Sequence, residues 1–149
     1  MKHLLGLVVW ALIAGAAAAA PTEAEKLLRA AEAGDTTRIE ALLANGVDIN
    51  SRDKRGFTPL MYAAANDRVQ TIAFLVRRGA DVNARSDIGE TAVICAIRYG
   101  RGKPETLKAL IDAGADVNTV MSDGGSALSW ANRKKRPESI ALLVKAGAH

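Results

Sequence analysis

The sequence predicts an all-α fold in which about four helix pairs, joined by β-hairpin-like turns, stack into a solenoid. The clearest sign is a repeated segment. Gly-Ala-Asp-Val-Asn at residues 79–83 recurs unchanged at 114–118, conservatively at 46–50 and in shortened form at 147–149. The four glycines are 33, 35 and 33 residues apart, a spacing typical of stacked repeats. The composition agrees, because 49% apolar residues with only 4% aromatic ones favour closely packed helices.

Residues 1–20 differ in composition from the rest of the chain. Lys2 and His3 form a short basic start, and an unbroken apolar run at residues 4–20 leads to Pro21. This pattern predicts a signal peptide at residues 1–19, cleaved near Ala19, and a mature domain at residues 20–149. The apolar run is short for a membrane span of about 20 residues. A retained membrane anchor is the alternative.

The ionisable and nucleophilic residues argue against catalysis. The formal net charge of +4 is too mild to imply nucleic-acid binding by itself. His3, His149 and Cys95 are the only histidines and the only cysteine, so the chain lacks a ligand set for zinc or copper and a nucleophile–base pair. We therefore expect no catalytic residues, no metal and no cofactor. Cys95 is predicted to be a small buried apolar residue.

The first repeat is predicted at residues 22–50 as a helix pair without a preceding hairpin. Thr22 and Glu25 form a capping-box pattern that starts the first helix. A break at Gly34 and Asp35 leads to a second helix. The polar residues of the first helix suit the outer side of a terminal repeat.

The second repeat, at residues 51–83, has stronger helix signals. Thr58 is a natural N-cap, and Pro59 follows at the first helical position, where no backbone donor is missed. The helix is predicted to break near Asn66 and Asp67 and to be followed by a second helix.

The third and fourth repeats, at residues 84–118 and 119–149, follow the same plan. Thr91 is the predicted cap of the third repeat, and its two extra residues fall within 99–103, between its helices. Such an insertion either contributes to a binding surface or is simply tolerated in a surface loop. In the second helices, core positions are predicted to repeat as Ile39, Leu42, Leu43; Ile72, Leu75, Val76; Leu107, Leu110, Ile111; and Ile140, Leu143, Val144. Tyr62, Cys95 and Trp130 share a further position that we expect to pack in the core.

Thr-Pro-Leu-Met-Tyr-Ala-Ala at residues 58–64, with the Gly-Ala-Asp-Val-Asn endings and a spacing near 33, resembles ankyrin repeats over residues 22–149. The resemblance implies hairpin turns followed by antiparallel helix pairs in a curved solenoid. The chain departs from the family at Met61, Ile94 and Ser129, which replace the histidine that usually follows Thr-Pro-Leu. Together with the leader, the resemblance indicates an exported, periplasmic-type bacterial member.

The resemblance also implies where a partner would bind, because partners of this family usually contact the hairpin tips and the first helix of each pair. The candidate partner-binding residues at these positions are Lys54, Arg55, Phe57, Asn66, Asp87, Ile88, Glu90, Arg98, Tyr99, Arg133 and Lys134. Phe57, Ile88 and Tyr99 are expected to face water as apolar anchors among charged neighbours. Packing of Phe57 and Ile88 against adjacent hairpins is the alternative. Basic residues between the helices, Arg98, Arg101, Lys103 and residues 133–136, form either an anion-attracting strip or a solvated end face.

These observations predict a monomeric, non-catalytic protein in the periplasm or outside the cell. It would bind another protein and protect, stabilise or neutralise it, whether that partner is an enzyme or a toxin. No nucleic acid is expected as a partner, and a membrane only if the leader is retained. The alternative is a membrane-tethered structural scaffold.

Overall fold

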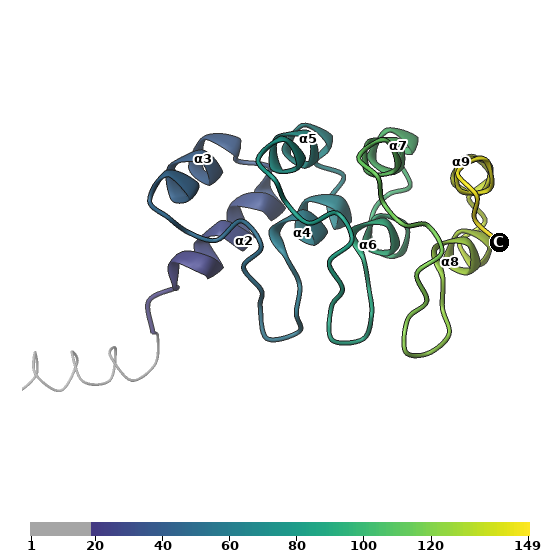
Figure 1. Cartoon of the computed structure of the whole chain (residues 1–149), viewed down its shortest axis with the longest axis horizontal. Helices are drawn as coiled ribbons and strands as arrows, with labels where there is room; N and C mark the ends of the chain where they lie inside the picture. The colour runs from purple at the N-terminus through teal and green to yellow at the C-terminus, as the bar shows by residue number, and fades with distance from the viewer. Residues whose placement is uncertain (1–18) are drawn as a thin grey trace, which may run out of the picture.

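The computed structural model describes residues 19–149, which form four helix pairs in chain order (Figure 1). The pairs are α2 (Glu23–Ala33) with α3 (Thr36–Ala44), α4 (Pro59–Ala65) with α5 (Val69–Arg77), α6 (Ala92–Arg98) with α7 (Pro104–Asp112), and α8 (Ala127–Arg133) with α9 (Pro137–Lys145). Within this range the β pairing consists of one isolated bridge between Val120 and Ser126. The predicted all-α solenoid is confirmed. The predicted signal peptide lies outside the described residues, apart from Ala19.

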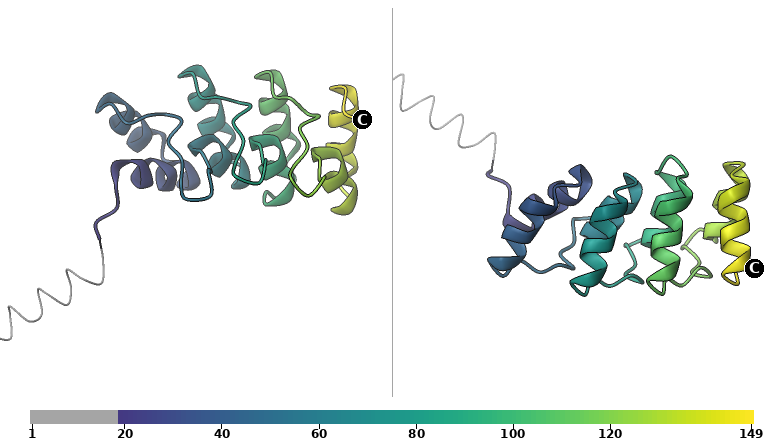
Figure 2. Two further views of the ribbon diagram at one scale, coloured as in Figure 1. Left: turned by 60° about the horizontal axis from the view of Figure 1, so that its bottom comes forward. Right: turned by 90° about the horizontal axis from the view of Figure 1, so that it is seen from above.

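The helices form two layers. The inner helices α2, α4, α6 and α8 contact one another in sequence, and the outer helices α5, α7 and α9 do the same (Figure 2). Three long hairpin-like loops project on the inner side, next to the inner helices (Figure 1). None of the helices among residues 19–149 has the length and apolar character needed to span a membrane.

Short hydroxyl side chains start the inner helices, as predicted for Thr22, Thr58 and Thr91 and as found also for Ser126. The side chains of Thr22, Thr58, Thr91 and Ser126 each accept a hydrogen bond from the backbone N–H three residues later, at 3.1, 3.4, 3.4 and 3.2 Å. Each bond satisfies a donor that has no partner inside the helix. The start of every inner helix is therefore encoded locally.

The repeated Gly-Ala-Asp-Val-Asn segment ends each outer helix and also links the repeats. Gly79 and Gly114 adopt φ values of 88° and 91°, a left-handed conformation that costs glycine little. Asp81 accepts a hydrogen bond from the Asn83 N–H at 2.9 Å, which closes a turn after the helix. The Asn83 side-chain oxygen in turn accepts the N–H of Asp116 in the next repeat at 2.7 Å.

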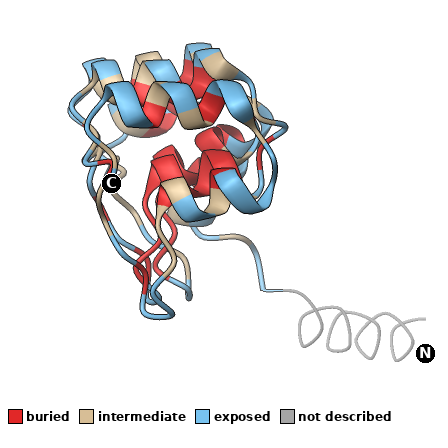
Figure 3. Cartoon of the chain, turned by 90° about the vertical axis from the view of Figure 1, so that its right-hand side faces the viewer, coloured by how far each residue is buried: buried red, intermediate tan, exposed pale blue. Residues whose placement is uncertain are grey.

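Seven of the twelve predicted core positions of the outer helices are buried, and four others are partly buried against the core (Figure 3). Ile72, Leu75 and Leu110 are fully buried, and Val76 is partly buried. Val144, at the equivalent position of the last described pair, is 54% exposed because no further pair covers it. Burial at these positions therefore depends on the neighbouring repeats.

The two extra residues of the third repeat are fixed by both neighbouring repeats. Asp67 of the second repeat is buried and accepts hydrogen bonds from the Arg101 N–H at 2.7 Å and the Thr106 hydroxyl at 2.8 Å. Arg136 of the fourth repeat donates to the Ile97 and Gly100 carbonyls at 2.9 and 2.7 Å. The insertion is thus part of the stacked structure.

Candidate binding surface

We call the side of the molecule that carries the hairpin tips the inner face. It consists of the tips at residues 53–57, 86–90 and 121–125 and the adjoining sides of α4, α6 and α8 (Figure 1). The tips are joined to one another, because the Asp87 N–H donates to the Arg55 carbonyl at 3.0 Å and the Ser122 N–H donates to the Ile88 carbonyl at 3.0 Å. The inner face is therefore one connected surface across three repeats.

A close approach between tips explains one of the glycines. Gly56 has a φ of 79°, and a Cβ atom there would lie 2.8 Å from Asp87 Oδ1 and 3.0 Å from the Asp87 backbone nitrogen. A side chain at this position would push the two tips apart. Glycine is needed here both for its conformation and for space.

Phe57 does not face water as expected, because its side chain is only 6% exposed. Its ring lies 5.8 Å from the ring of Tyr62 in its own repeat and 6.4 Å from that of Tyr99 in the next repeat. The guanidinium carbon of Arg55 lies 4.5 Å from the ring centroid and covers it. Phe57 is thus buried, as the alternative held, but against rings of α4 and of the end of α6 rather than against an adjacent hairpin.

Glu90, at the position equivalent to Phe57, is also unavailable for direct contact with a partner because it is only 1% exposed. Its Oε1 accepts hydrogen bonds from Arg98 Nη1 at 2.6 Å and from the Tyr99 hydroxyl at 2.8 Å. A buried carboxylate needs such charged and hydrogen-bonding partners to offset its lost hydration. Glu90 is thus a positioning residue that fixes Arg98 and Tyr99.

Arginine side chains cover the aromatic rings of the fourth repeat as well. The guanidinium carbons of Arg98 and Arg133 lie 4.7 and 4.5 Å from the Trp130 ring, and that of Arg98 lies 5.2 Å from the Tyr99 ring. Cation–π contacts of this kind hold the planar guanidinium flat against the ring. Trp130 is partly buried, and its indole N–H has no acceptor among the described residues.

The position shared by Tyr62, Cys95 and Trp130 packs on the core, as predicted, although to different depths. Cys95 is fully buried, and burial raises the pKa of its thiol, which makes it an unreactive core residue. Tyr62 and Trp130 are partly buried at the edge of the core.

Tyr62 organises the first of the three tips. Its hydroxyl donates to Asp53 Oδ2 at 2.7 Å, and Asp53 Oδ1 accepts the N–H groups of Arg55 and Phe57 at 2.8 and 2.9 Å. Burial opposes the charge on Asp53, but these hydrogen bonds and the nearby Arg55 outweigh it and lower the pKa of this carboxyl group. Asp53 therefore stays ionised and holds the tip in shape.

The remaining candidates are accessible. Ile88 and Tyr99 are 45% and 48% exposed, which confirms that these two apolar side chains face water. Arg98 is partly exposed, and the other candidates are exposed: Lys54, Arg55, Asn66, Asp87, Arg133 and Lys134. Sequence reasoning missed Arg52 and Arg85, whose guanidinium groups donate to the Arg85 and Val120 carbonyls of the following repeats at 2.7 and 2.8 Å. The spacing of 33 residues between Arg52 and Arg85, equal to one repeat, could have indicated that both have the same role in joining repeats.

The basic residues between the helices fall into two groups, those that join repeats and those that are open to solvent. Arg136 is fixed by backbone carbonyls, and Arg68 donates to the Glu32 carbonyl at 3.0 Å in the same way. Arg101 and Lys103 are exposed and line a small polar pocket with Tyr99. Arg136 thus serves mainly to join repeats, whereas Arg101 and Lys103 remain open to solvent.

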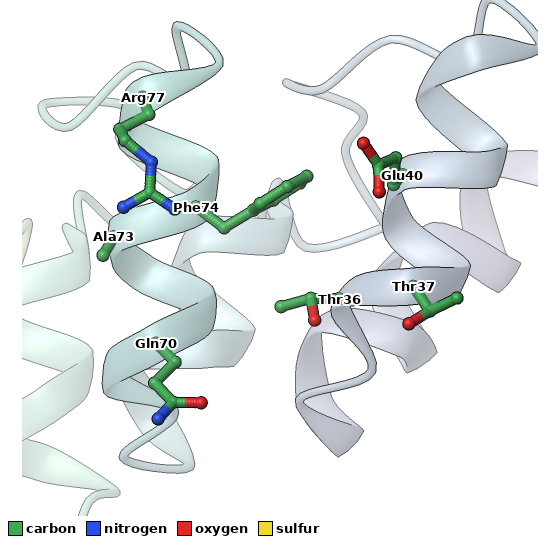
Figure 4. Close-up of a pocket in the computed structure, with 7 residues that line it drawn as sticks. All are labelled: Thr36, Thr37, Glu40, Gln70, Ala73, Phe74 and Arg77. Atoms are coloured by element: carbon green, nitrogen blue, oxygen red, sulfur yellow. The ribbon is translucent and has the colours of Figure 1, made fainter.

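A second pocket lies on the outer side, between α3 and α5 (Figure 4). It is lined by Thr36, Thr37, Glu40, Gln70, Ala73, Phe74 and Arg77. Glu40 is paired with Arg78 at 2.9 Å, so its charge is already neutralised. Among the described residues, no group of three His, Cys, Asp or Glu side chains is arranged to hold a metal ion.

Besides burial, Glu90 helps to raise the pKa of the Tyr99 hydroxyl. Burial, the hydrogen bond to Glu90 and the charge of Glu90 raise the pKa of Tyr99 to about 12. We expect Glu90→Gln to lower this pKa towards the ordinary value of about 10, because the carboxylate charge is removed. The stabilisation linked to this raised pKa is complete below pH of about 10 and is lost as the pH rises towards 12.

Ultraviolet titration of tyrosinate absorbance measures this shift. A Tyr62→Phe background isolates the signal, since the sequence contains only two tyrosines. An unchanged Tyr99 midpoint in Glu90→Gln would contradict the positioning role of Glu90.

Comparison with known proteins gives a consistent result. The family model for ankyrin repeats (3 copies) matches residues 7–86 and 27–121. The chain is 33% identical over 134 residues to "Ankyrin repeat, SAM and basic leucine zipper domain-containing protein 1" of Dasypus novemcinctus, covering 86% of this chain and 28% of that protein. It is 38% identical over 109 residues to "Neurogenic locus notch homolog protein 2" of Homo sapiens, covering 72% of this chain and 4% of that protein.

A third relative is "E3 ubiquitin-protein ligase KEG" of Arabidopsis thaliana, with 30% identity over 115 residues, 76% of this chain and 7% of the relative. The chain therefore spans about a quarter or less of the length of these relatives. All three come from eukaryotes, so they lend no support to the expected bacterial and exported character.

Proposed function

We propose that this chain, which belongs to the ankyrin-repeat family, is a non-catalytic module that binds another protein through its inner face. Ankyrin repeats generally mediate protein–protein interaction. The single observation that carries the proposal is the arrangement of the inner face. Exposed Tyr99 lies beside Arg98, which buried Glu90 and the Trp130 ring hold in place, and exposed Ile88 lies on a tip of the same connected surface.

This arrangement has the features of a binding hot spot. Apolar and aromatic anchors with fixed charged neighbours lose little conformational freedom when a partner docks. Glu90 holds Tyr99 and Arg98 in position through two hydrogen bonds. A partner would therefore meet a preformed surface.

Capture of a partner protein from cell extract tests the proposal. Ile88→Ala and Tyr99→Ala should each weaken capture about tenfold or more, which corresponds to about 1.4 kcal/mol. Val144→Ala is the matched control, because Val144 is an equally exposed aliphatic residue at 54% but lies on an outer helix. Thermal unfolding of each variant separates lost binding from lost folding.

Equal capture by all three variants would contradict the proposal, as would a loss of capture that follows a loss of folding. Capture that is weakened by Ile88→Ala and Tyr99→Ala but retained by Val144→Ala supports it.

The compartment and biological role form a finer part of the proposal. A basic start and an apolar run at residues 2–20 support export to the periplasm or the outside of the cell. There the monomeric chain would protect, stabilise or neutralise its partner. Mass determination of the native protein tests this: a species beginning near Ala20 supports export, whereas a membrane-bound species that retains residues 1–19 favours a tethered scaffold.

A further inference from the structure

We propose that the inner face binds an extended, acidic polypeptide segment of the partner, in which carboxylate side chains alternate with apolar ones. This inference rests on the proposed function and names the chemistry of the segment that docks. Three arginines of successive repeats, Arg55, Arg98 and Arg133, lie over aromatic rings on this face.

The three guanidinium groups are presented in the same way. Each lies over an aromatic ring, at 4.5 Å for Arg55 and Phe57, 4.7 Å for Arg98 and Trp130, and 4.5 Å for Arg133 and Trp130. A guanidinium group above a ring can still donate from its remaining N–H groups, which match the oxygens of a carboxylate. A partner carboxylate can therefore pair with a side chain that is already held in place.

The positive charges on this face are only partly balanced by carboxylates of the protein itself. Arg133 has no carboxylate within 4.0 Å among the described residues, and Arg55 makes only a long contact of 3.8 Å with Asp53. The Arg98 side chain is paired with Glu90 but remains 26% exposed. Exposed Lys54 and Lys134 add further positive charge.

The excess of cations lies among the exposed groups of the whole face. Asp53 and Glu90 of the tips are held by contacts within the protein, so Asp87 and Asp123 are the exposed carboxylates, and Asp123 Oδ1 accepts the Gly125 N–H at 2.8 Å. The exposed cations are Lys54, Arg55, Arg133 and Lys134. A helix dipole favours cations at the ends of α6 and α8 but does not require them to cover aromatic rings from adjacent repeats. The excess of cations thus favours a partner of negative charge.

Exposed apolar side chains distinguish an acidic polypeptide from a simple anion. Tyr99, beside Arg98, is 48% exposed, and Ile88, on the tip at residues 86–90, is 45% exposed. An inorganic anion or a lipid headgroup would leave these side chains in water, whereas apolar residues of a bound segment would cover them. One arginine per repeat also favours an extended segment that crosses several repeats.

Fluorescence anisotropy with a labelled synthetic peptide of alternating Glu and Leu residues tests the proposal on the full chain. The peptide in which every Glu is replaced by Gln provides the uncharged comparison. We expect the acidic peptide to bind, its affinity to fall as salt is added, and the Gln peptide to bind at least tenfold more weakly.

Two double variants with the same loss of charge locate the site. Arg55→Gln with Arg133→Gln should weaken binding of the acidic peptide about tenfold or more. Arg38→Gln with Arg77→Gln removes two exposed arginines from the outer helices and should change the affinity less than about twofold. Equal losses in both double variants would overturn the proposal, because the effect would then come from net charge alone.

Inorganic phosphate and phosphatidylserine vesicles serve as competing ligands. Tighter binding of either one than of the acidic peptide would overturn the proposal in favour of a simple anion or a membrane surface. Absence of acidic-peptide binding would also overturn it. In that case, partner capture that still depends on Ile88 and Tyr99 would leave the proposed function standing. Partner capture unaffected by Ile88→Ala and Tyr99→Ala would instead contradict the proposed function itself.

Discussion

Replacing Leu75 by alanine is expected to lower the free energy of unfolding by about 2–5 kcal/mol. Leu75 is fully buried between the helix layers and belongs to the row of leucines that recurs at residues 42, 75, 110 and 143. Removing its side chain leaves a cavity in close-packed surroundings that relax only partly. Urea denaturation followed by circular dichroism measures the loss.

Val144→Ala is the control for Leu75→Ala. Val144 lies on the outer helix of the last described pair and is 54% exposed, so its replacement should change stability by about 0.5 kcal/mol or less. A Leu75→Ala midpoint equal to that of the parent chain would show that the repeats do not stack as described.

Replacing Phe57 by alanine is expected to cost about 3 kcal/mol of unfolding free energy, near the low end of the range for a buried phenylalanine. The ring is 6% exposed and packs against Tyr62 and Tyr99, so its loss removes contacts in two repeats at once. Thermal unfolding with and without captured partner measures the change.

Ile88→Ala, at a neighbouring tip, is the comparison for Phe57→Ala. Ile88 is 45% exposed, and its replacement should leave stability nearly unchanged while weakening capture. If Phe57→Ala were as stable as Ile88→Ala, the burial of Phe57 at the contact between repeats would be refuted.

The fold could be predicted because its signals are local and repeated. Thr58 and Thr91 cap helices through their own side chains, and Gly79 and Gly114 end helices through their own backbone conformation. The spacing of these signals also aligned the core positions, since equivalent residues of stacked repeats are buried together. Neither inference required knowledge of distant contacts.

The candidate surface was only partly predictable, because burial at the tips depends on the next repeat. Phe57 and Glu90 occupy equivalent positions in their repeats, and the repeat pattern alone predicts that both side chains are accessible to a partner. Phe57 is covered by Tyr99 of the next repeat, whereas Glu90 is buried by its bonds to Arg98 and Tyr99. Asp67 is also buried by the next repeat, because it accepts hydrogen bonds from Arg101 in the inserted loop and from Thr106 in α7, which lie 34 and 39 positions away in the sequence.

The central claim is that the inner face is where a partner binds. Hydrogen–deuterium exchange of the chain, alone and with the captured partner, tests it most directly. We predict slower exchange at the tips 53–57, 86–90 and 121–125 and at the ends of α6 and α8, with no change in α5, α7 and α9. Protection confined to the outer helices, with unchanged exchange at the tips, would contradict the claim.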